Sequence, residues 1–380
     1  MRLSELLREV EFEGSIKNDF DIKFVTDDSR LVRPGALFVC IRHRSFDGHT
    51  AAAEALASGA AAVVTQERLG LENELNVADS RAAYARLCAA LCGHPERKLR
   101  MIGVTGTNGK TTVTTLIRNI LSDSGIKTLL TGTVCNRLGE ESLPSGLTTP
   151  KPPELYSLLS RAVLSGCEAC VAEVSSQALV QGRLEGIAFD AAVFTNITRD
   201  HLDYHGTFEN YLAAKKKLFE HSEVSAVNLD DPRADEIIAA SSGKTVTFST
   251  VLDCADYTAK NISLLPEGVS FELVSKGRIE HINFASPGLF SVSNAMAAVV
   301  CAINLGVDPR SVAQSLARSK GVCGRLERVE CGTPYSVIID YAHTPDGLEQ
   351  VLRALRPSCR GKLIVLFGCG GDRDKTKRPL

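Results

Sequence analysis

The sequence predicts an α/β fold built around a mostly parallel sheet, and three observations support this prediction. Strand-like apolar runs alternate with helical patterns between about residues 99 and 322, which is typical of parallel strands joined by crossover helices. A glycine-rich turn with a lysine separates one such strand from a helix. Apolar residues make up 44% of the 380 residues, which is enough for large hydrophobic cores.

Residues 1–98 are expected to form a first α/β unit. Strands are predicted at residues 35–41 and 59–64, with a helix over residues 51–58 between them. This alternation places the three elements in one α/β layer. The polar stretch 93–98 contains glycine and proline and indicates a linker to the next part of the chain.

Residues 99–323 are expected to form the central part of the chain. Buried strands are predicted at residues 163–174, 191–195 and 224–229, with helical patterns between them. The regular alternation of apolar and polar residues over 257–284 indicates antiparallel strands. We therefore expect a mostly parallel sheet with an antiparallel extension.

A third part is expected to begin at residue 324. A strand at residues 336–340, a helix at 346–355 and a second strand at 362–367 are predicted. A single strand–helix–strand unit is small for an independent core. We therefore expect residues 324–380 to be the start of a Rossmann-like domain whose remainder is missing.

The strongest functional motif is Thr-Gly-Thr-Asn-Gly-Lys-Thr at residues 105–111, directly after the apolar segment 101–104. In such a turn, backbone N–H groups and the positive end of a helix face a bound phosphate. Lys110 can reach a terminal phosphate, and Thr111 Oγ1 is placed to hold Mg²⁺. Apolar residues at helical spacing follow, and Gly125 is a plausible end of that helix. An ordinary strand–turn–helix is the alternative, but Gly-Lys-Thr at such a turn is a demanding combination.

Two further segments supply candidate metal ligands at strand ends. Glu173 lies at the end of an apolar strand-like segment, and the carboxyl ends of parallel strands line the ligand crevice of such sheets. The segment 194–206 places two histidines and two aspartates close together, a composition that suits a divalent cation. The alternatives are a solvated or paired glutamate and a polar loop with hydrogen-bonded imidazoles.

Lys215 lies on the apolar stripe of its predicted helix, because Tyr211, Leu218 and Phe219 stand at helical spacing from it. Burying an unpaired ammonium is costly. Desolvation lowers the pKa of a lysine and makes its amine reactive, for example with CO₂, which gives a metal-binding carbamate. The alternative, which spacing alone favours, is snorkelling, with the stem buried and the ammonium in water.

Composition argues against several functional classes. The net charge of −2, without a long basic block, argues against a nucleic-acid partner. The first 14 residues lack an apolar run, so we expect no signal peptide, and no segment is long enough to span a membrane. The 12 scattered cysteines are expected to be reduced thiols of a cytosolic protein.

Taken together, these segments resemble the ATP-dependent Mur ligases over nearly the whole chain, and most closely the member that adds the third residue of the peptidoglycan stem peptide. The motifs that carry the resemblance stand at residues 106–112 (ATP loop), 200–206 (a signature close to that of this member), 28–30 and 46–49 (uridine-nucleotide domain), and 340–346 and 368–374 (start of the third domain). The resemblance implies three domains, namely a UDP-substrate domain over 1–98, an ATPase domain over 99–323 and an incomplete amino-acid-binding domain over 324–380.

The reaction implied is ATP-dependent amide ligation. By resemblance, meso-diaminopimelate is added to UDP-MurNAc-L-Ala-D-Glu through an acyl phosphate, with two Mg²⁺ ions. The Asp-Asn-Pro-Arg-type motif that selects the amino acid in this family is absent from the sequence, so lysine stays open as the added residue. A phosphate-loop NTPase or a non-catalytic nucleotide-binding scaffold is the alternative from another class. The resemblance also implies a cytoplasmic monomer without nucleic-acid or membrane partners.

The resemblance assigns roles to individual residues. ATP is bound by Gly106, Thr107, Asn108, Gly109, Lys110, Thr111, Thr112, Asn294, Arg325, Asp340 and His343. The UDP substrate is bound by Ser29, Thr148, Thr149, Ser175, Gln181 and Arg183. Thr111, Glu173 and His201 serve the metal ions, Lys215 is N6-carboxylated, and Lys110, His201 and Lys215 are the catalytic group. Arg373 meets the carboxylate of the incoming amino acid.

Overall fold

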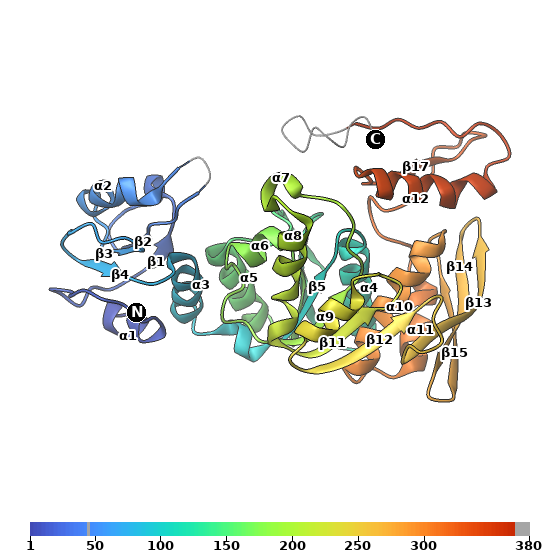
Figure 1. The fold of residues 1–380 in the computed structure, drawn as a ribbon, viewed down its shortest axis with the longest axis horizontal. Helices are drawn as coiled ribbons and strands as arrows, with labels where there is room; N and C mark the ends of the chain where they lie inside the picture. The colour runs from blue at the N-terminus through green and yellow to red at the C-terminus, as the bar shows by residue number, and fades with distance from the viewer. Residues whose placement is uncertain (44–45, 369–380) are drawn as a thin grey trace. The chain divides into compact units, whose positions relative to one another are not determined.

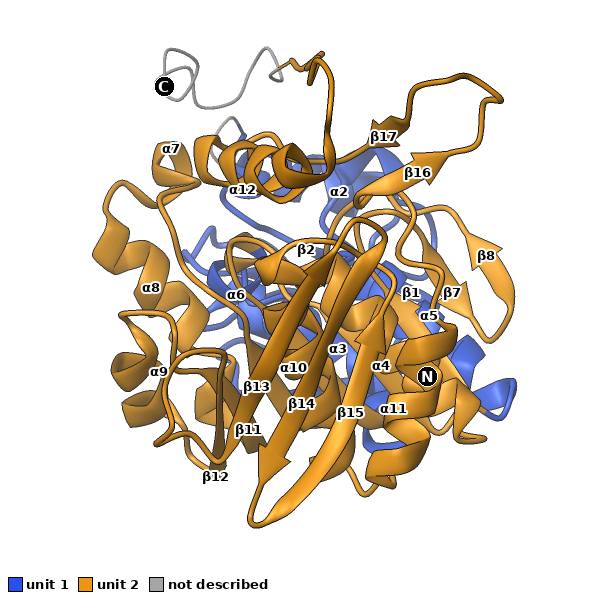
Figure 2. Cartoon of the chain, turned by 90° about the vertical axis from the view of Figure 1, so that its right-hand side faces the viewer, with its two compact units in different colours: residues 1–99, 150–166, 178–187 blue, residues 100–149, 167–177, 188–380 orange. Residues whose placement is uncertain are grey.

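The computed structural model describes residues 1–43 and 46–368, and the chain divides into two compact units (Figures 1 and 2). The first unit, blue in Figure 2, contains residues 1–99, 150–166 and 178–187, and the second, orange, contains residues 100–149, 167–177 and those from 188 onward. The predicted α/β class is confirmed. The three-domain limits at residues 98 and 323 stay a prediction. No described helix has the length and apolarity needed to cross a membrane.

The first unit contains a four-stranded parallel sheet in the order β1-β2-β3-β4. Its strands are β1 (Phe24–Thr26), β2 (Ala36–Val39), β3 (Ala62–Thr65) and β4 (Glu74–Asn76), and its helices are α1 (Leu3–Leu6), α2 (Ala52–Ala57), α3 (Ser80–Leu91) and α5 (Pro152–Leu164). The predicted strand at 35–41 and the helix at 51–58 are confirmed with shorter limits, and the strand predicted at 59–64 is confirmed but begins at Ala62 and ends at Thr65. All residues of β2 and β3 are buried, as expected for central parallel strands.

The predicted linker at residues 93–98 belongs to the folded part of the first unit. It contains the 3-10 helix η4 (Pro95–Lys98), in which Pro95 and Glu96 are buried. This position favours proline, because the fixed φ of proline suits the first turn of a helix. The composition of a linker therefore does not distinguish an exposed connection from a packed helical turn.

The second unit contains an eleven-stranded sheet in the order β15-β14-β13-β12-β11-β10-β5-β9-β6-β7-β8. The parallel strands are β5 (Arg100–Thr105), β6 (Thr128–Thr131), β9 (Ala169–Glu173), β10 (Phe189–Phe194), β11 (Ser222–Asn228) and β12 (Lys244–Ser249). The predicted antiparallel extension is confirmed as β13 (Tyr257–Leu265), β14 (Gly268–Ser275) and β15 (Arg278–Phe284), and a second antiparallel ribbon is formed by β7 (Asn136–Leu138) and β8 (Glu141–Leu143).

The strand predicted at residues 163–174 is too long at its start. Residues 163 and 164 end α5, and β9 begins only at Ala169. Gly166 separates the two elements with a φ of +73°, a left-handed conformation that ends helices and that glycine adopts without strain. An apolar run that continues through a helix end therefore misled the prediction.

Helices lie between and after the strands of the large sheet along the chain. They are α4 (Lys110–Asp123), α6 (Ser176–Val180), α7 (Leu202–His205), α8 (Phe208–Lys216), α9 (Ala234–Ala240), α10 (Leu289–Asn304) and α11 (Pro309–Arg318). Val113, Leu116 and Ile117 of α4 share one hydrophobic cluster with Ile102 and Val104 of β5. This buried stripe is the one predicted from helical spacing, and it fixes α4 at the end of β5.

The third predicted part is confirmed only for its first two elements. The strand β17 (Val337–Ile339) pairs antiparallel with β16 (Glu327–Val329), and the helix α12 (Pro345–Leu355) follows. The strand predicted at residues 362–367 is wrong, because no strand is formed there and Leu366 is 99% exposed. A strand is stable only when a neighbour accepts and donates its backbone hydrogen bonds, and β17 pairs only with β16 in the described residues.

Candidate active site

The predicted phosphate loop joins β5 to α4 near the middle of the eleven-stranded sheet. Gly109 precedes the first residue of α4 with a φ of +87°, which favours glycine. A Cβ at Gly109 would also collide with the side-chain oxygen of Asn294. The first turn of a helix leaves its N–H groups without intrahelical acceptors, so this loop and helix start form an anion-binding arrangement.

Lys110 lies folded over the loop. Its Nζ donates hydrogen bonds to the backbone oxygens of Gly106 at 2.8 Å and Thr107 at 3.0 Å. Burial lowers the pKa of Lys110, and the carboxylate of Glu173 opposes this shift. Carbonyl oxygens are weaker partners for an ammonium than phosphate oxygens, so Lys110 is available to a bound phosphate.

A second segment, which directly follows β10, holds the phosphate loop. Thr195 Oγ1 donates to the backbone oxygen of Asn108 at 2.6 Å. The backbone N–H of Asn108 donates to Asn196 Oδ1 at 3.0 Å, and that of Thr198 donates to Thr107 Oγ1 at 2.9 Å. No individual role was predicted for these three residues after β10. Their signal is positional, because β10 pairs with β5 and both strands end at the same edge.

Glu173 lies at this same edge of the sheet. It is the last residue of β9, stands opposite Val104 of β5 and is 1% exposed. Its carboxylate accepts hydrogen bonds from the backbone N–H of Thr133 at 2.9 Å and from Thr133 Oγ1 at 2.8 Å. The structure therefore holds a carboxylate in place at the end of a strand that neighbours the phosphate-loop strand.

Three of the predicted substrate-binding residues gather around Glu173. Thr149 Oγ1 donates to the backbone oxygen of Glu173 at 2.7 Å, and the N–H of Ser175 donates to Thr149 Oγ1 at 3.0 Å. Thr148 Oγ1 lies 3.1 Å from Thr133 Oγ1, whose proton is donated to Glu173. These hydroxyl groups thus form one polar cluster with the Glu173 carboxylate.

The other predicted substrate-binding residues belong to the first unit. Ser29 begins the 3-10 helix η2 (Ser29–Leu31), which Asp28 caps by accepting from the N–H of Arg30. In the same unit, Arg183 Nε and Nη2 donate to Gln181 Oε1 at 3.0 and 2.7 Å.

Lys215 on α8 is buried rather than snorkelling, with 1% of its surface exposed. Its Nζ lies 3.5 Å from Thr105 Oγ1 and 4.7 Å from the ring centroid of Tyr211. Burial lowers the pKa of Lys215 well below its ordinary value, the Lys110 ammonium lowers it further, and Asp200 opposes both. Burial therefore favours the neutral, nucleophilic form of the Lys215 amine over the ammonium.

Tyr211 connects Lys215 to the phosphate loop, a role that the sequence analysis missed. Its hydroxyl lies 3.0 Å from Thr107 Oγ1 within the loop. Its ring faces the Lys215 ammonium and lies 5.2 Å from the His205 ring. Helical spacing identified Tyr211 only as an apolar neighbour, because a sequence does not reveal the partner of a tyrosine hydroxyl.

His201 directly precedes α7 with a φ of +53°, which is uncommon for residues other than glycine. Burial lowers the pKa of His201 to about 4 despite the nearby Asp200 carboxylate, so its ring is neutral at pH 7 and can act as a metal ligand. His205 instead lies 2.9 Å from Ser176 Oγ through its Nε2. Over residues 1–43 and 46–368, no three His, Cys, Asp or Glu side chains are placed to hold a metal together.

The last group of predicted nucleotide-binding residues lies just before β16, just after β17 and on α10, and Arg325 and Asn294 reach the loop. Arg325 Nη2 donates to Thr111 Oγ1 at 2.8 Å, and the guanidinium lies 4.7 Å from the ring centroid of Tyr341. Asp340 accepts from the N–H of Leu326 at 2.8 Å and so fixes the segment that carries Arg325. Asn294 is buried against the loop at Gly109.

His343, which was predicted to bind ATP, does not join this group. His343 is exposed, and its Nδ1 lies 2.9 Å from the backbone oxygen of Tyr341. Arg373, together with most of the motif at 368–374, lies outside the described residues. A contact that the sequence analysis did not predict is instead formed by Asp346 of α12, whose carboxylate accepts from Asn108 Nδ2 at 3.0 Å.

Models of known protein families match three segments of the chain. Residues 104–302 match the Mur ligase middle domain, residues 324–380 match the Mur ligase glutamate ligase domain, and residues 21–90 match the Mur ligase family catalytic domain. The first match alone covers more than half of the chain and contains the phosphate loop, Glu173, His201 and Lys215.

Individual relatives extend this similarity over the full chain. UDP-N-acetylmuramoyl-L-alanyl-D-glutamate–2,6-diaminopimelate ligases of Clostridium tetani and Syntrophomonas wolfei are 40% and 41% identical to this chain. Both matches cover 100% of this chain, and they cover 80% and 79% of the two relatives. A solved structure of a ligase with the same name is 33% identical, with a TM-score of 0.82, and the match covers 100% of this chain and 79% of the other. MurF from Acinetobacter baumannii shares the fold, with 24% identity and a TM-score of 0.66. That match covers 93% of this chain and 76% of the MurF chain.

Proposed function

The chain belongs to the Mur ligase family, and we propose that it joins meso-diaminopimelate to UDP-MurNAc-L-Ala-D-Glu at the expense of ATP. The names of the relatives that match the whole chain support this substrate pair. The single observation that carries the proposal is the buried Lys215 amine beside Thr105, the residue that leads into the phosphate loop. A simple NTPase needs the loop and a carboxylate, but it has no need of this lysine.

The phosphate loop is the proposed site for ATP. The N–H groups at the start of α4 and the Lys110 ammonium face the phosphates, as in other strand–loop–helix sites. Arg325 contributes a second positive charge at Thr111. His343 is assigned to the adenosine side, together with Asn294 and Asp340, by family resemblance. Positive charge at the terminal phosphate favours transfer because the transition state spreads charge over the phosphoryl oxygens.

Magnesium ions fit the donor set of the site. Thr111 Oγ1, the buried Glu173 carboxylate and the neutral His201 ring are the residues proposed to hold them. Mg²⁺ takes one or two protein carboxylates and completes its octahedron with phosphates and water, so the buried Glu173 carboxylate suits a Mg²⁺ ion that arrives with the nucleotide. When bound, Mg²⁺ neutralises phosphate charge.

Lys215 is proposed to be carbamylated. Its neutral amine attacks CO₂, the new N–C bond forms, and the proton is released, which leaves an N6-carboxylate. The structure supports this step because the amine has a strongly lowered pKa. The Lys110 ammonium repels a protonated Lys215, whereas it attracts the carboxylate of a carbamylated Lys215. A fixed anion of this kind orients the ligands of a metal.

The reaction then follows two steps. The D-glutamyl γ-carboxylate attacks the γ-phosphorus of ATP, an O–P bond forms to give an acyl phosphate, and ADP leaves. The amine of diaminopimelate next attacks the acyl carbon, and the tetrahedral intermediate expels phosphate. Holding the reactants in line contributes on the order of 7–11 kcal/mol to lowering the barrier, and a dry site protects the acyl phosphate from water.

The remaining assignments rest on family resemblance. Ser29, Thr148, Thr149, Ser175, Gln181 and Arg183 are proposed to hold the UDP substrate, and Arg373 is proposed to hold the carboxylate of the added amino acid. We propose domains over residues 1–98, 99–323 and 324–380 with these respective tasks of UDP-substrate binding, ATP cleavage and amino-acid binding. A cytoplasmic location and a monomeric state stay predictions.

One competition experiment tests the proposed function. The protein is incubated with ATP, UDP-MurNAc-L-Ala-D-Glu and equal amounts of meso-diaminopimelate and lysine, and the product mass is measured. A product that contains diaminopimelate, formed together with ADP and phosphate, is expected. A lysine product would support the alternative substrate, and ATP hydrolysis indifferent to the dipeptide and the amino acids would support an NTPase.

A further inference from the structure

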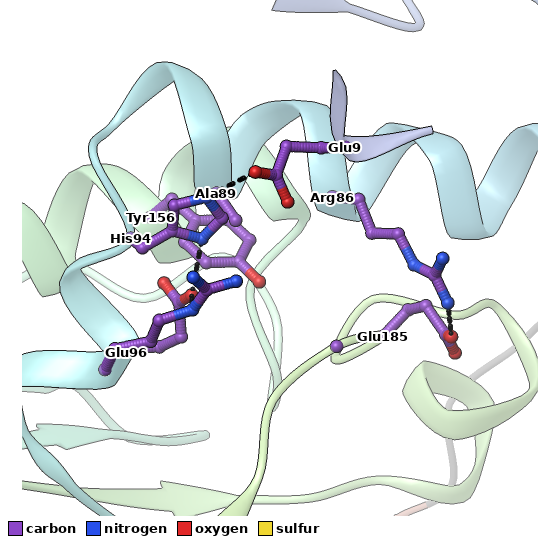
Figure 3. A pocket seen from close by; sticks show the side chains of 9 residues that line it. Glu9, Arg86, Ala89, His94, Glu96, Tyr156 and Glu185 are labelled. Atoms are coloured by element: carbon purple, nitrogen blue, oxygen red, sulfur yellow. Dashed lines mark hydrogen bonds and ion pairs between the residues drawn. The ribbon is translucent and has the colours of Figure 1, made fainter. Parts of the chain in front are cut away.

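The charged side chains around a cavity of about 240 Å³ in the first unit pair with one another (Figure 3). Arg86 pairs with Glu185 at 2.8 Å. His94 lies 2.9 Å from Glu96 through Nδ1 and 3.4 Å from Glu9 through Nε2. These groups pair within the first unit, whereas a buried polar network in the second unit leads to the phosphate loop.

The network begins at the turn that follows β11. Asn228, the last residue of β11, is 6% exposed, and Asp231 in the turn is 7% exposed. Because β11 pairs in parallel with β10, the two strands end at the same edge of the sheet. A buried carboxylate is costly unless hydrogen bonds compensate for the lost water, so the partners of Asp231 show what this turn holds.

Both side chains hold the backbone of the segment 195–198, which directly follows β10. Asn228 Nδ2 donates to the backbone oxygen of Thr195 at 2.8 Å. Asp231 Oδ2 accepts from the N–H of Ile197 at 2.7 Å, and its Oδ1 accepts from the N–H of Arg233 at 2.9 Å. Each carboxylate oxygen thus has its own backbone donor, which fixes the orientation of the Asp231 side chain.

The segment 195–198 in turn carries the phosphate loop. The N–H of Thr107 donates to the backbone oxygen of Asn196 at 2.8 Å, and Thr195 Oγ1 donates to that of Asn108 at 2.6 Å. A Cβ at Gly106 would collide with Thr195 Oγ1, so the loop backbone lies directly on this segment. Two backbone groups of the segment that supports the loop are therefore held by the turn after β11.

We propose that Asn228 and Asp231 are positioning residues for ATP, which keep the phosphate loop in its phosphate-binding conformation before the nucleotide arrives. The hydrogen bonds from these side chains to Thr195 and Ile197 mean that they act through the segment 195–198 rather than on the nucleotide. A loop that is already ordered saves the free energy that binding would otherwise spend on ordering it. The inference rests on the proposed assignment of ATP to this loop.

Two variants release the segment 195–198 in different ways. Asp231→Asn offers one acceptor oxygen where the carboxylate has two, so the N–H of Ile197 or of Arg233 loses its acceptor. Asn228→Leu removes the donor to Thr195 from a side chain of similar size. Asp235→Asn, which changes an exposed carboxylate on α9, is the matched control.

Calorimetric titration of the full chain with ADP and MgCl₂ measures the effect on nucleotide affinity. Asp231→Asn and Asn228→Leu are each expected to weaken ADP binding by about tenfold, because the free loop relaxes and binding must restore it. Asp235→Asn is expected to bind ADP like the unaltered chain. If the unaltered chain binds no ADP, the proposed ATP site fails and this inference with it. Normal ADP binding by both folded variants overturns the inference alone.

Hydrogen exchange without nucleotide separates a positioning role from a purely structural one, because it reports opening region by region. In both variants, the peptide that covers residues 105–112 is expected to exchange faster, while β2 and β3 in the first unit exchange as in the unaltered chain. Addition of ADP is expected to slow exchange in the loop again. Equally faster exchange throughout the chain, or failure of both variants to fold, would assign Asn228 and Asp231 to overall stability and overturn the inference.

Discussion

Replacing Lys215 by alanine tests whether the buried amine acts as a carbamate. The side chain is 1% exposed and ends 3.5 Å from Thr105 Oγ1, so a carboxylate on Nζ would lie beside the phosphate loop and the Lys110 ammonium. If that anion orients metal ligands, its loss is expected to reduce ligase turnover by about 10–100-fold, as for other groups that position metal ligands. Turnover is measured as ADP release that depends on both the UDP-dipeptide and the amino acid.

Chemical rescue distinguishes the carbamate from a plain ammonium. Pentanoate reproduces the atoms that Lys215→Ala removes, from Cγ to the carbamate carboxylate, whereas propylammonium reproduces only the unmodified side chain. We expect pentanoate to restore part of the turnover and propylammonium to restore none. Lys217→Ala on the exposed side of the same segment is the matched control and should keep its turnover. Near-normal turnover of Lys215→Ala, or rescue by propylammonium, would refute the carbamate.

Three further variants test other parts of the site. Lys110→Ala is expected to lose ATP-dependent turnover while calorimetry still detects the UDP-dipeptide, and loss of both would indicate misfolding instead. Tyr211→Phe removes the hydroxyl that lies within hydrogen-bond distance of Thr107 but keeps the ring that faces Lys215. We expect KM for ATP to rise by up to about tenfold, which corresponds to the loss of one hydrogen bond. An unchanged KM would show that the Tyr211 hydroxyl does not support the loop. His201 has a pKa of about 4 in the folded protein, which is below its value in the unfolded chain. It therefore contributes stability that is complete above about pH 6.5 and is lost as the pH falls toward 4. Thermal unfolding of His201→Asn should show a smaller loss of stability between about pH 6.5 and 4, and identical pH profiles of the two proteins would contradict the lowered pKa.

The phosphate loop was predictable because all of its signals are local. The apolar strand, the glycines, Lys110 and the helical stripe lie within one short stretch of sequence, and each reports its own conformation. Gly125 was likewise predictable, since α4 ends just before it and its φ is +84°. The Thr195–Thr198 support was not, because its hydrogen bonds reach the loop from far along the chain.

Lys215 shows the limit of periodicity most clearly. Helical spacing placed it on the apolar face correctly, but the choice between snorkelling and burial depends on what packs over the ammonium. Here Thr105 of β5 and the Tyr211 ring cover it, and pairing of distant strands decides the first of these neighbours. The wrong strand at 362–367 has a related cause, because an apolar run is a strand only where a partner strand is present.

In the proposed reaction, the D-glutamyl carboxylate is activated by phosphoryl transfer at the phosphate loop that follows Thr105. The most direct test uses UDP-MurNAc-L-Ala-D-Glu labelled with ¹⁸O in the γ-carboxylate, together with ATP and meso-diaminopimelate, and measures the mass of the released phosphate. An acyl phosphate transfers one carboxylate oxygen to phosphate, so ¹⁸O-containing phosphate is predicted. Phosphate without the label, released alongside amide product, would contradict the mechanism.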